Sequence, residues 1–197
     1  MNIIVLIKQV PDLVEELFIN ESGINLDYSY IKYIISESDD HALEQALLLK
    51  EKYGGTVTVF GNDIRDVDES LFMALAKGAD KVFKVKLNDS SLIDNHSVAK
   101  YFQTVLPQFP YDIILTGVQS IEDIDGQIGA LLASYLHLPY IGVVNNIQFD
   151  GLTKSIRIKK EYSGGVLSAM VVKLPALIGI QAAEKPPRYL PISKIRQ

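Results

Sequence analysis

Short apolar runs alternate with segments of helical period from the N-terminus to Pro139, and this alternation limits the fold more than any other feature. The apolar runs cover residues 3–7, 56–60, 81–85 and 112–116. Such runs are typical of strands that are buried on both faces of a sheet. Helical segments begin near Asp39 and then cover residues 67–77, 92–106 and 125–138. The alternation predicts an α/β fold with a doubly wound, mostly parallel sheet.

Two regions depart from this alternation and predict antiparallel hairpins. After the first strand, Pro11 prevents simple continuation, and apolar residues 17–19 and 24–26 flank the turn residues 20–23. Beyond Pro139 the strand-like segments cover residues 143–149, 155–162, 166–173 and 177–180. Asp-Gly and Gly-Gly turns separate the first three of them. We expect one domain over residues 1–183, followed by a proline-rich segment over 184–197.

Composition narrows the class of protein. With 197 residues and 48% hydrophobic content, the chain can bury about 70% of its unfolded surface in one core. A net charge of -5 argues against a general nucleic-acid binder, which needs a basic stripe to neutralise phosphates. No apolar run approaches the roughly 20 residues of a spanning helix, so we expect no membrane insertion and a cytoplasmic location. The absence of cysteine excludes disulfides and thiolate ligands, so redox work would need a cofactor.

The loop over residues 117–128 is the best candidate for a ligand site. It joins the end of a buried strand to the start of a helix, at the sheet edge where open α/β folds bind ligands. Its acids do not form a calcium loop, because Ile121 and Leu132 stand where the first and last carboxylates belong. No metal site is therefore expected. If a nucleotide binds here, the carboxylates of the loop would repel its phosphate. The expected phosphate ligands are then backbone N–H groups with Gln119, Ser120 and Gln127.

The acids of this loop have a second interpretation. Asp123 and Asp125 lie at the start of the predicted helix, so they are expected to cap it or to shape the turn. The spacing Gly126-x-x-Gly129 alone is too weak to count as a dinucleotide fingerprint.

Catalytic patterns are scarce. His41, His96 and His137 lie on separate expected elements, and the chain contains neither G-x-S-x-G nor H-E-x-x-H. Lys8 stands at a strand end, where a lone lysine is most often a solvated or structural charge. The sequence therefore favours a binding protein over an enzyme.

Five segments, taken in order, resemble a known family. They are Lys8-Gln9-Val10-Pro11-Asp12, the helix start over 38–46, the turn over 74–80, the loop over 117–129, and Pro187-Arg188-Tyr189. Over nearly its whole length the sequence is similar to the β subunit of electron transfer flavoproteins. The resemblance implies a Rossmann-like fold of the adenine nucleotide α hydrolase type and a role as an electron carrier.

The resemblance also implies cofactors and their ligands. It predicts a heterodimer with an α subunit that carries the redox-active FAD, while this chain holds a structural AMP, or a second FAD in electron-bifurcating relatives. The residues that the motifs place against this nucleotide are Leu6, Ser36, Glu37, Ser38, Asp39, Asn62, Gly117, Val118, Gln119, Ser120, Ile121, Glu122, Asp123, Ile124, Asp125, Gly126, Gln127 and Ile128. Ser36-Glu37 departs from the Asn-Pro pair that is usual at that position.

The C-terminal segment is expected to bind partners. In the family, residues after Pro-Arg-Tyr dock an apolar side chain into flavoprotein dehydrogenases such as acyl-CoA dehydrogenase. Ile192 has the matching position here and is flanked by Leu190 and Ile195. Family members continue into an arm that reaches across the α subunit, whereas this sequence stops at Gln197. Three explanations are open: the arm is naturally absent, another chain supplies it, or it was removed from this sequence.

Two other functions stay open at this point. One is a stand-alone adenine-nucleotide protein, such as a universal-stress-like ATP sensor or a nucleotide α hydrolase, although the late glycine-rich phosphate loop of those families is missing. The other is a structural partner that binds no nucleotide and docks through its tail.

Overall fold

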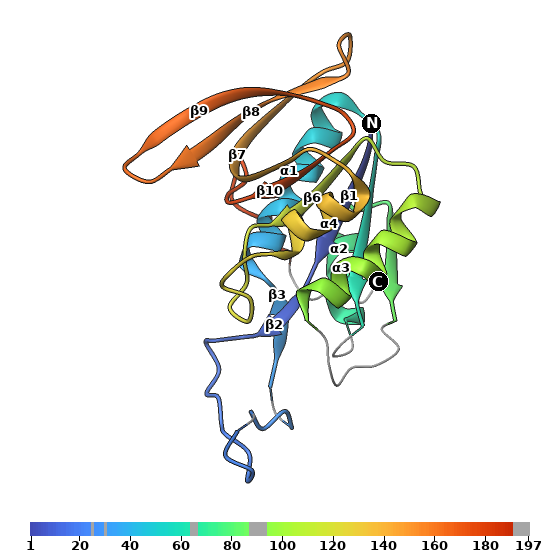
Figure 1. Cartoon of the computed structure of the whole chain (residues 1–197). Helices are drawn as coiled ribbons and strands as arrows, with labels where there is room; N and C mark the ends of the chain where they lie inside the picture. The colour runs from blue at the N-terminus through green and yellow to red at the C-terminus, as the bar shows by residue number, and fades with distance from the viewer. Residues whose placement is uncertain (25, 30, 64–66, 87–93, 191–197) are drawn as a thin grey trace.

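An eight-stranded sheet forms the centre of the computed structural model, which describes residues 1–24, 26–29, 31–63, 67–86 and 94–190. The strand order is β5-β4-β1-β6-β10-β7-β8-β9 (Figure 1). The parallel strands are β1 (Asn2–Ile7), β4 (Thr56–Asn62), β5 (Lys81–Val85), β6 (Ile113–Gly117) and β10 (Ala176–Ile180). The prediction of an α/β fold with a mostly parallel sheet is confirmed.

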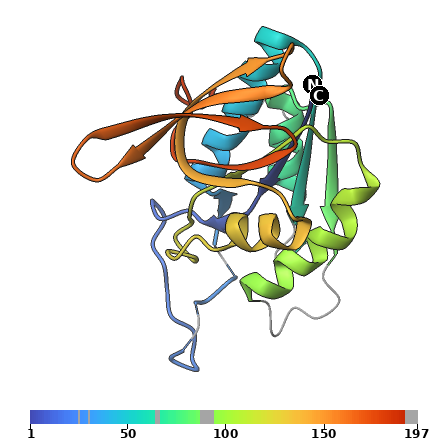
Figure 2. The same ribbon diagram turned by 45° about the horizontal axis from the view of Figure 1, so that its top comes forward.

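Helices cover both faces of the parallel strands, as Figures 1 and 2 show. α1 (Glu37–Tyr53) and α2 (Asp68–Lys77) pack on one face through residues such as Leu43, Leu47 and Leu71. α3 (Asn95–Val105), the short 3₁₀ helix η2 (Leu106–Gln108) and α4 (Ile128–Leu136) pack on the other face through Phe102 and Leu132. Each strand therefore alternates its side chains between two apolar clusters.

Two helices begin later than the sequence predicted. α3 begins at Asn95 instead of 92, because the carboxylate of Asp94 accepts the backbone N–H of Ser97 at 2.7 Å and caps the helix. α4 begins at Ile128 instead of 125, because residues 120–126 form a hydrogen-bonded turn of their own.

β7 (Tyr140–Asp150) differs from the prediction in both extent and pairing. The sequence predicted an antiparallel strand over 143–149. The strand instead begins at Tyr140 and first pairs in parallel with β10, with Ile141 opposite Ile178. Val143 has φ 62°, and the register of this pairing shifts before Val144, which pairs in parallel with Ile180 of β10. From Val144 onward β7 also pairs antiparallel with β8 (Ser155–Tyr162) on its other side.

The antiparallel extension itself is confirmed. β8 and β9 (Val166–Lys173) pair along their full length and project beyond the parallel strands (Figure 1). β9 forms the end of the sheet order.

The insertion after β1 forms a separate two-stranded ribbon. β2 (Gln9–Pro11) pairs antiparallel with β3 (Tyr33–Ile35), and Ile19 and Leu26 form an antiparallel bridge further out. This agrees with the expected hairpin. Figure 1 shows the ribbon leaving the body at the carboxyl end of β1. Within the described ranges, no helix is long and apolar enough to cross a membrane.

Candidate functional site at the carboxyl ends of β1 and β6

The order of the strands reverses between β1 and β6. From β1 the chain proceeds through α1 to β4 and then to β5 on one side, whereas β6 pairs with β1 on the other side. Connections on either side of such a point run along opposite faces of the sheet and leave room for ligands outside the carboxyl ends of the strands. The loop over 117–128 and the residues after β1 lie at this edge.

A buried carboxylate joins the two strand ends. Asp39, in the first turn of α1, accepts the backbone N–H of Lys8 at 2.9 Å through Oδ2 and the backbone N–H of Gly117 at 2.8 Å through Oδ1. The carbonyl of Lys8 in turn accepts the N–H of Ser36 at 2.8 Å. Asp39 therefore fixes the start of α1 against both β1 and β6.

Gly117 is required for this close approach. A Cβ at this position would lie 2.6 Å from Oδ1 of Asp39 and 2.6 Å from Cβ of Ser38. Any side chain at residue 117 would push the start of α1 away from β6.

Burial raises the pKa of Asp39 to about 7, because the carboxylate is removed from water and has a like charge, Asp40, nearby. The hydrogen bonds from Gly117 and Lys8, and the positive charge of Lys8, act in the opposite direction and only partly compensate. A carboxyl group with such a pKa changes its protonation near neutral pH.

The loop after β6 is held by its own hydrogen bonds. Ser120 and Asp123 exchange two backbone hydrogen bonds of 3.1 Å, and Oδ1 of Asp123 accepts the N–H of Gly126 at 3.2 Å. Asn95 of α3 donates to the same oxygen at 2.9 Å. Gly126 has φ 60°, and a Cβ there would lie 1.9 Å from the carbonyl oxygen of Val118. Asp123 therefore shapes the turn, as one of the two interpretations predicted.

The other interpretation, that Asp123 and Asp125 cap α4, is wrong. The N-cap position is Gln127, whose own side chain makes no capping hydrogen bond. Asp125 is exposed. Among the described residues, the N–H groups at the start of α4 therefore have no side-chain cap, and such groups at a helix N-terminus can bind an anion.

Thr116 is a candidate that sequence reasoning missed. Its Oγ1 is buried and has no hydrogen-bond partner among the described residues. A Cβ on Gly129, in the first turn of α4, would lie 2.9 Å from this oxygen. A buried hydroxyl without a partner is costly, and such a group in a native protein is often completed by a ligand. The sequence pattern does not mark Thr116 as a ligand residue, because threonine is common in strands.

Strand alternation places Thr116 on the same face as two predicted ligand residues. Leu6 and Ile114 belong to the apolar cluster on the α3 and α4 face, and Thr116 follows Ile114 by two residues. Asn62 likewise follows Phe60, a member of the same cluster, by two residues and is buried. Leu6, Asn62 and Thr116 therefore share one face at the carboxyl edge.

The other predicted residues differ in exposure. Ser36 and Asp39 are buried and turned toward the strand ends, whereas Glu37 is exposed. Gln119 and Gln127 are exposed at the loop. The structure thus brings the three predicted segments and Leu6 to one edge.

The three histidines lie on separate elements of the described chain. Nδ1 of His41 lies 3.2 Å from the N–H of Ala183, Nδ1 of His96 lies 2.9 Å from the hydroxyl of Tyr135, and His137 ends α4. Across the described ranges, no group of three or more His, Asp or Glu residues is arranged to hold a metal.

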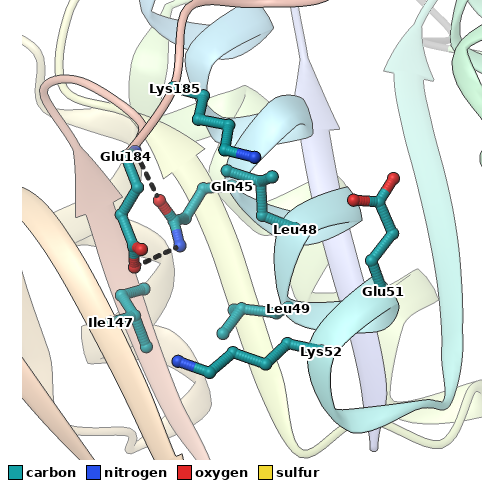
Figure 3. Close-up of a pocket in the computed structure, with 8 residues that line it drawn as sticks. All are labelled: Gln45, Leu48, Leu49, Glu51, Lys52, Ile147, Glu184 and Lys185. Atoms are coloured by element: carbon teal, nitrogen blue, oxygen red, sulfur yellow. Dashed lines mark hydrogen bonds between the residues drawn. The ribbon is translucent and has the colours of Figure 1, made fainter.

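A separate pocket of about 340 Å³ lies away from this edge (Figure 3). It is formed by the later turns of α1, by Ile147 of β7 and by Glu184 and Lys185 of the C-terminal segment. Gln45 and Glu184 exchange hydrogen bonds of 3.0 and 3.4 Å at its rim. None of the predicted nucleotide ligands lines it.

The C-terminal segment is anchored to α1 just before the predicted docking residues. Arg188 binds the buried carboxylate of Glu44 through Nε at 2.9 Å and a terminal nitrogen at 2.8 Å, and its other terminal nitrogen lies 2.9 Å from Glu51. Burial alone would raise the pKa of Glu44, but the hydrogen bonds and charge of Arg188 outweigh it and lower that pKa. Leu190 is half-buried, whereas Ile192 and Ile195 lie outside the described residues.

Comparison with known protein families matches residues 25–196 to the electron transfer flavoprotein domain. The chain belongs to the electron transfer flavoprotein family. The electron transfer flavoprotein subunit beta of Methylophilus methylotrophus is 33% identical over 199 residues, which cover 100% of this chain and 75% of that protein. The subunit of the same name from Clostridium acetobutylicum is 33% identical over 201 residues, covering 99% and 74%. That from Bacillus subtilis is 29% identical over 190 residues, covering 96% and 72%.

These findings confirm the resemblance to electron transfer flavoprotein β subunits. As a chain of this type, the protein is an electron carrier rather than a catalytic enzyme, as the sequence predicted.

The five family segments now have structural roles within an electron transfer flavoprotein. Three of them, at 8–12, 38–46 and 117–129, meet at the carboxyl edge of β1 and β6. The turn over 74–80 ends with Asp80, whose carboxylate accepts the N–H of Val57 at 2.7 Å and the ammonium of Lys50 at 2.6 Å. Arg188, in the fifth, anchors the C-terminal segment to α1.

Proposed function

We propose that this β subunit binds an adenine nucleotide at the carboxyl ends of β1 and β6. The nucleotide is AMP, or a second FAD if the protein bifurcates electrons. The observation that carries this proposal is the first turn of α4, where Gln127 makes no side-chain cap. This turn lies beside the buried hydroxyl of Thr116, which has no hydrogen-bond partner among the described residues. Leu6 and Asn62 present their side chains on that same face.

The predicted ligand residues divide into two roles. The N–H groups of the loop and of α4, with Gln119, Ser120 and Gln127, would hold the phosphate. Asp39 acts differently, because both of its carboxylate oxygens accept backbone N–H groups within the protein. Its contribution is to fix the strand ends that the ligand contacts.

The binding energy must come from several groups. Micromolar affinity requires about -8 kcal/mol, whereas a helix N-terminus contributes about 0.3–1 kcal/mol and about 2 kcal/mol at best. Burial of the adenine ring and hydrogen bonds from strand ends would supply the remainder. Loss of any single polar contact should therefore weaken binding without abolishing it.

The relatives carry the name subunit beta, which implies an α partner. We infer a heterodimer in which FAD on the α subunit accepts and releases the electrons. The electrons would come from flavoprotein dehydrogenases such as acyl-CoA dehydrogenase. Leu190, Ile192 and Ile195 would form the docking segment, which starts two residues after the anchored Arg188.

The proposal is tested by what the purified protein carries. After purification without added ligand, a denatured extract should yield AMP, ADP or FAD in chromatography, at about one molecule per chain. An extract without any adenine nucleotide would contradict the proposal and favour a purely structural partner. Two flavins per complex with the α subunit, instead of one, would identify the bifurcating form.

A further inference from the structure

The loop over 117–128 carries negative charge where the proposed ligand would bring more. Glu122, Asp123 and Asp125 lie in the loop, and the loop itself contains no basic residue. Like charges this close repel one another, so a phosphate here needs a cation from another segment. The ion pair between Lys8 and Glu122 brings one such cation to this loop.

Lys8 follows β1 directly and reaches across to the loop after β6. Its Nζ lies 3.5 Å from Oε2 of Glu122 and 3.4 Å from Oγ of Ser120. Both distances exceed the roughly 2.7–2.9 Å of a strong charge-assisted hydrogen bond. The two side chains are also partly open to solvent, at 29% for Lys8 and 27% for Glu122. A phosphate oxygen could therefore replace these contacts at small cost.

The backbone of Lys8 is held from two sides, so its side chain starts from a fixed point. Its N–H donates to Asp39 at 2.9 Å, and its carbonyl accepts the N–H of Ser36 at 2.8 Å. Asp39 also holds Gly117, where the loop begins, at 2.8 Å. One buried carboxylate thus sets the distance between the lysine and the loop it approaches.

We propose that Lys8 is the cation that binds the phosphate of the adenine nucleotide, and that Glu122 holds its ammonium group until the phosphate displaces it. This inference rests on the proposed nucleotide site. It assigns to Lys8 a direct ligand contact, although a lysine at a strand end first suggested a solvated or structural charge. Ser120, 3.4 Å from Nζ, would share the same phosphate.

Equilibrium binding of AMP and of adenosine separates the phosphate contact from the rest of the site. Lys8→Met should weaken AMP binding by about 10- to 100-fold, the range for a hydrogen bond to a charged group. Adenosine has no phosphate, so its affinity should stay within about twofold of the wild type. Lys8→Arg keeps the charge and should retain most of the AMP affinity.

Variants of the acids provide a matched comparison. Glu122→Gln should tighten AMP binding several-fold, because it frees the ammonium group and removes a negative charge. Asp125→Asn removes one charge from the same loop without touching the Lys8 pair, and should tighten AMP binding less. These two variants decide the question even where Lys8→Met fails to fold.

The possible results are distinguishable. A wild-type protein that binds neither AMP nor adenosine would overturn the proposed function and this inference together. Wild-type AMP binding with an unchanged Lys8→Met affinity would overturn the inference alone. An equal loss of AMP and adenosine affinity in Lys8→Met would also overturn it, because the lysine would then act only on the fold. Equal effects of Glu122→Gln and Asp125→Asn would reject the exchange between Glu122 and phosphate.

Discussion

At the scale of single residues, Asp39 changes what the family motif implies. The motif places Asp39 among the nucleotide ligands, yet its two oxygens accept the N–H groups of Lys8 and Gly117 at 2.9 and 2.8 Å. Its position in the motif is explained by this geometry, since the carboxylate joins three segments that form the site. Gly117 belongs to the same arrangement, because a Cβ there would lie 2.6 Å from Asp39.

The protonation of Asp39 should make stability depend on pH. Burial raises its pKa to about 7, against 3.8 for the unperturbed group. Between these values the folded protein binds more protons than the unfolded chain at this site, so rising pH favours unfolding. The contribution of Asp39 to the free energy of unfolding should be full below about pH 4 and decrease until about pH 7. Above pH 7 it should stay constant.

Asp39→Asn provides the reference for this pH dependence, since asparagine has the same shape and does not titrate. Denaturant unfolding of both proteins between pH 4 and 8 gives the difference in free energy of unfolding. We expect the free energy of unfolding of the wild type, relative to that of the variant, to decrease as pH rises from about 4 to 7. A difference that is independent of pH would show that the carboxyl group keeps an ordinary pKa.

At the scale of elements, α1 connects the nucleotide edge to the C-terminal segment. Its first turn holds β1 and β6 through Asp39, and its middle turns bind Glu184 through Gln45 and Arg188 through Glu44. Lys77, at the end of α2, forms an ion pair with Asp40 of α1. α1 therefore fixes the position of Arg188, two residues before Leu190, the first of the predicted docking residues.

Removal of Arg188 should test this anchor. Arg188→Ala leaves the buried Glu44, whose side chain is 4% exposed, without its main partner. Loss of one partner of a buried pair costs about 3–5 kcal/mol, and the 29% exposure of Arg188 suggests about 2–3 kcal/mol here. Denaturant unfolding measures the effect.

Two controls accompany this variant. Arg157→Ala removes an exposed arginine from β8 and should change the free energy of unfolding by less than about 0.5 kcal/mol. When Glu44 is already replaced by Gln, Arg188→Ala should lower the free energy of unfolding much less, because no buried charge is left unpaired. If Arg188→Ala lowered the free energy of unfolding equally in the wild type and in Glu44→Gln, the ion pair between Arg188 and Glu44 would not be what stabilises the fold.

At the scale of the whole molecule, the sequence predicted those features that depend on local pattern. β1, β4, β5 and β6 lie within two residues of their predicted bounds, because strands buried on both faces consist of short apolar runs. The parallel pairing of Tyr140 and Ile141 with β10 could not be predicted, since a strand pattern does not reveal its neighbour. The contact between Asp39 and Gly117 joins residues 78 positions apart, and only the fold brings them together.

The proposed docking to a dehydrogenase also depends on the assembled molecule. Burial of one apolar side chain is worth about 1.5–3 kcal/mol, so Ile192→Ala should slow electron transfer at low dehydrogenase concentration by about tenfold. The nucleotide content should not change, because Ile192 lies outside the proposed nucleotide ligands. Stopped-flow reduction of the heterodimer measures the rate.

A matched control uses another exposed apolar side chain. Leu152 is 98% exposed in the turn between β7 and β8, and Leu152→Ala should transfer electrons at the wild-type rate. If Ile192→Ala were as fast as Leu152→Ala, the C-terminal segment would have no docking role.

The central claim is that an adenine nucleotide binds at the loop after β6, and Gly126 gives a way to locate it. A Cβ at this position would lie 1.9 Å from the carbonyl oxygen of Val118, so Gly126→Ala must displace the loop backbone. Gly151 lies in the turn after β7, where a Cβ would meet Phe149 at an ordinary 3.5 Å. Gly151→Ala is therefore a control that leaves the loop intact.

Native mass spectrometry of these three proteins is the most direct measurement. We predict one bound adenine nucleotide per chain for the wild type and for Gly151→Ala, and a largely empty Gly126→Ala protein that is still folded by circular dichroism. A wild-type chain without nucleotide, or a Gly126→Ala chain that retains it fully, would contradict the account.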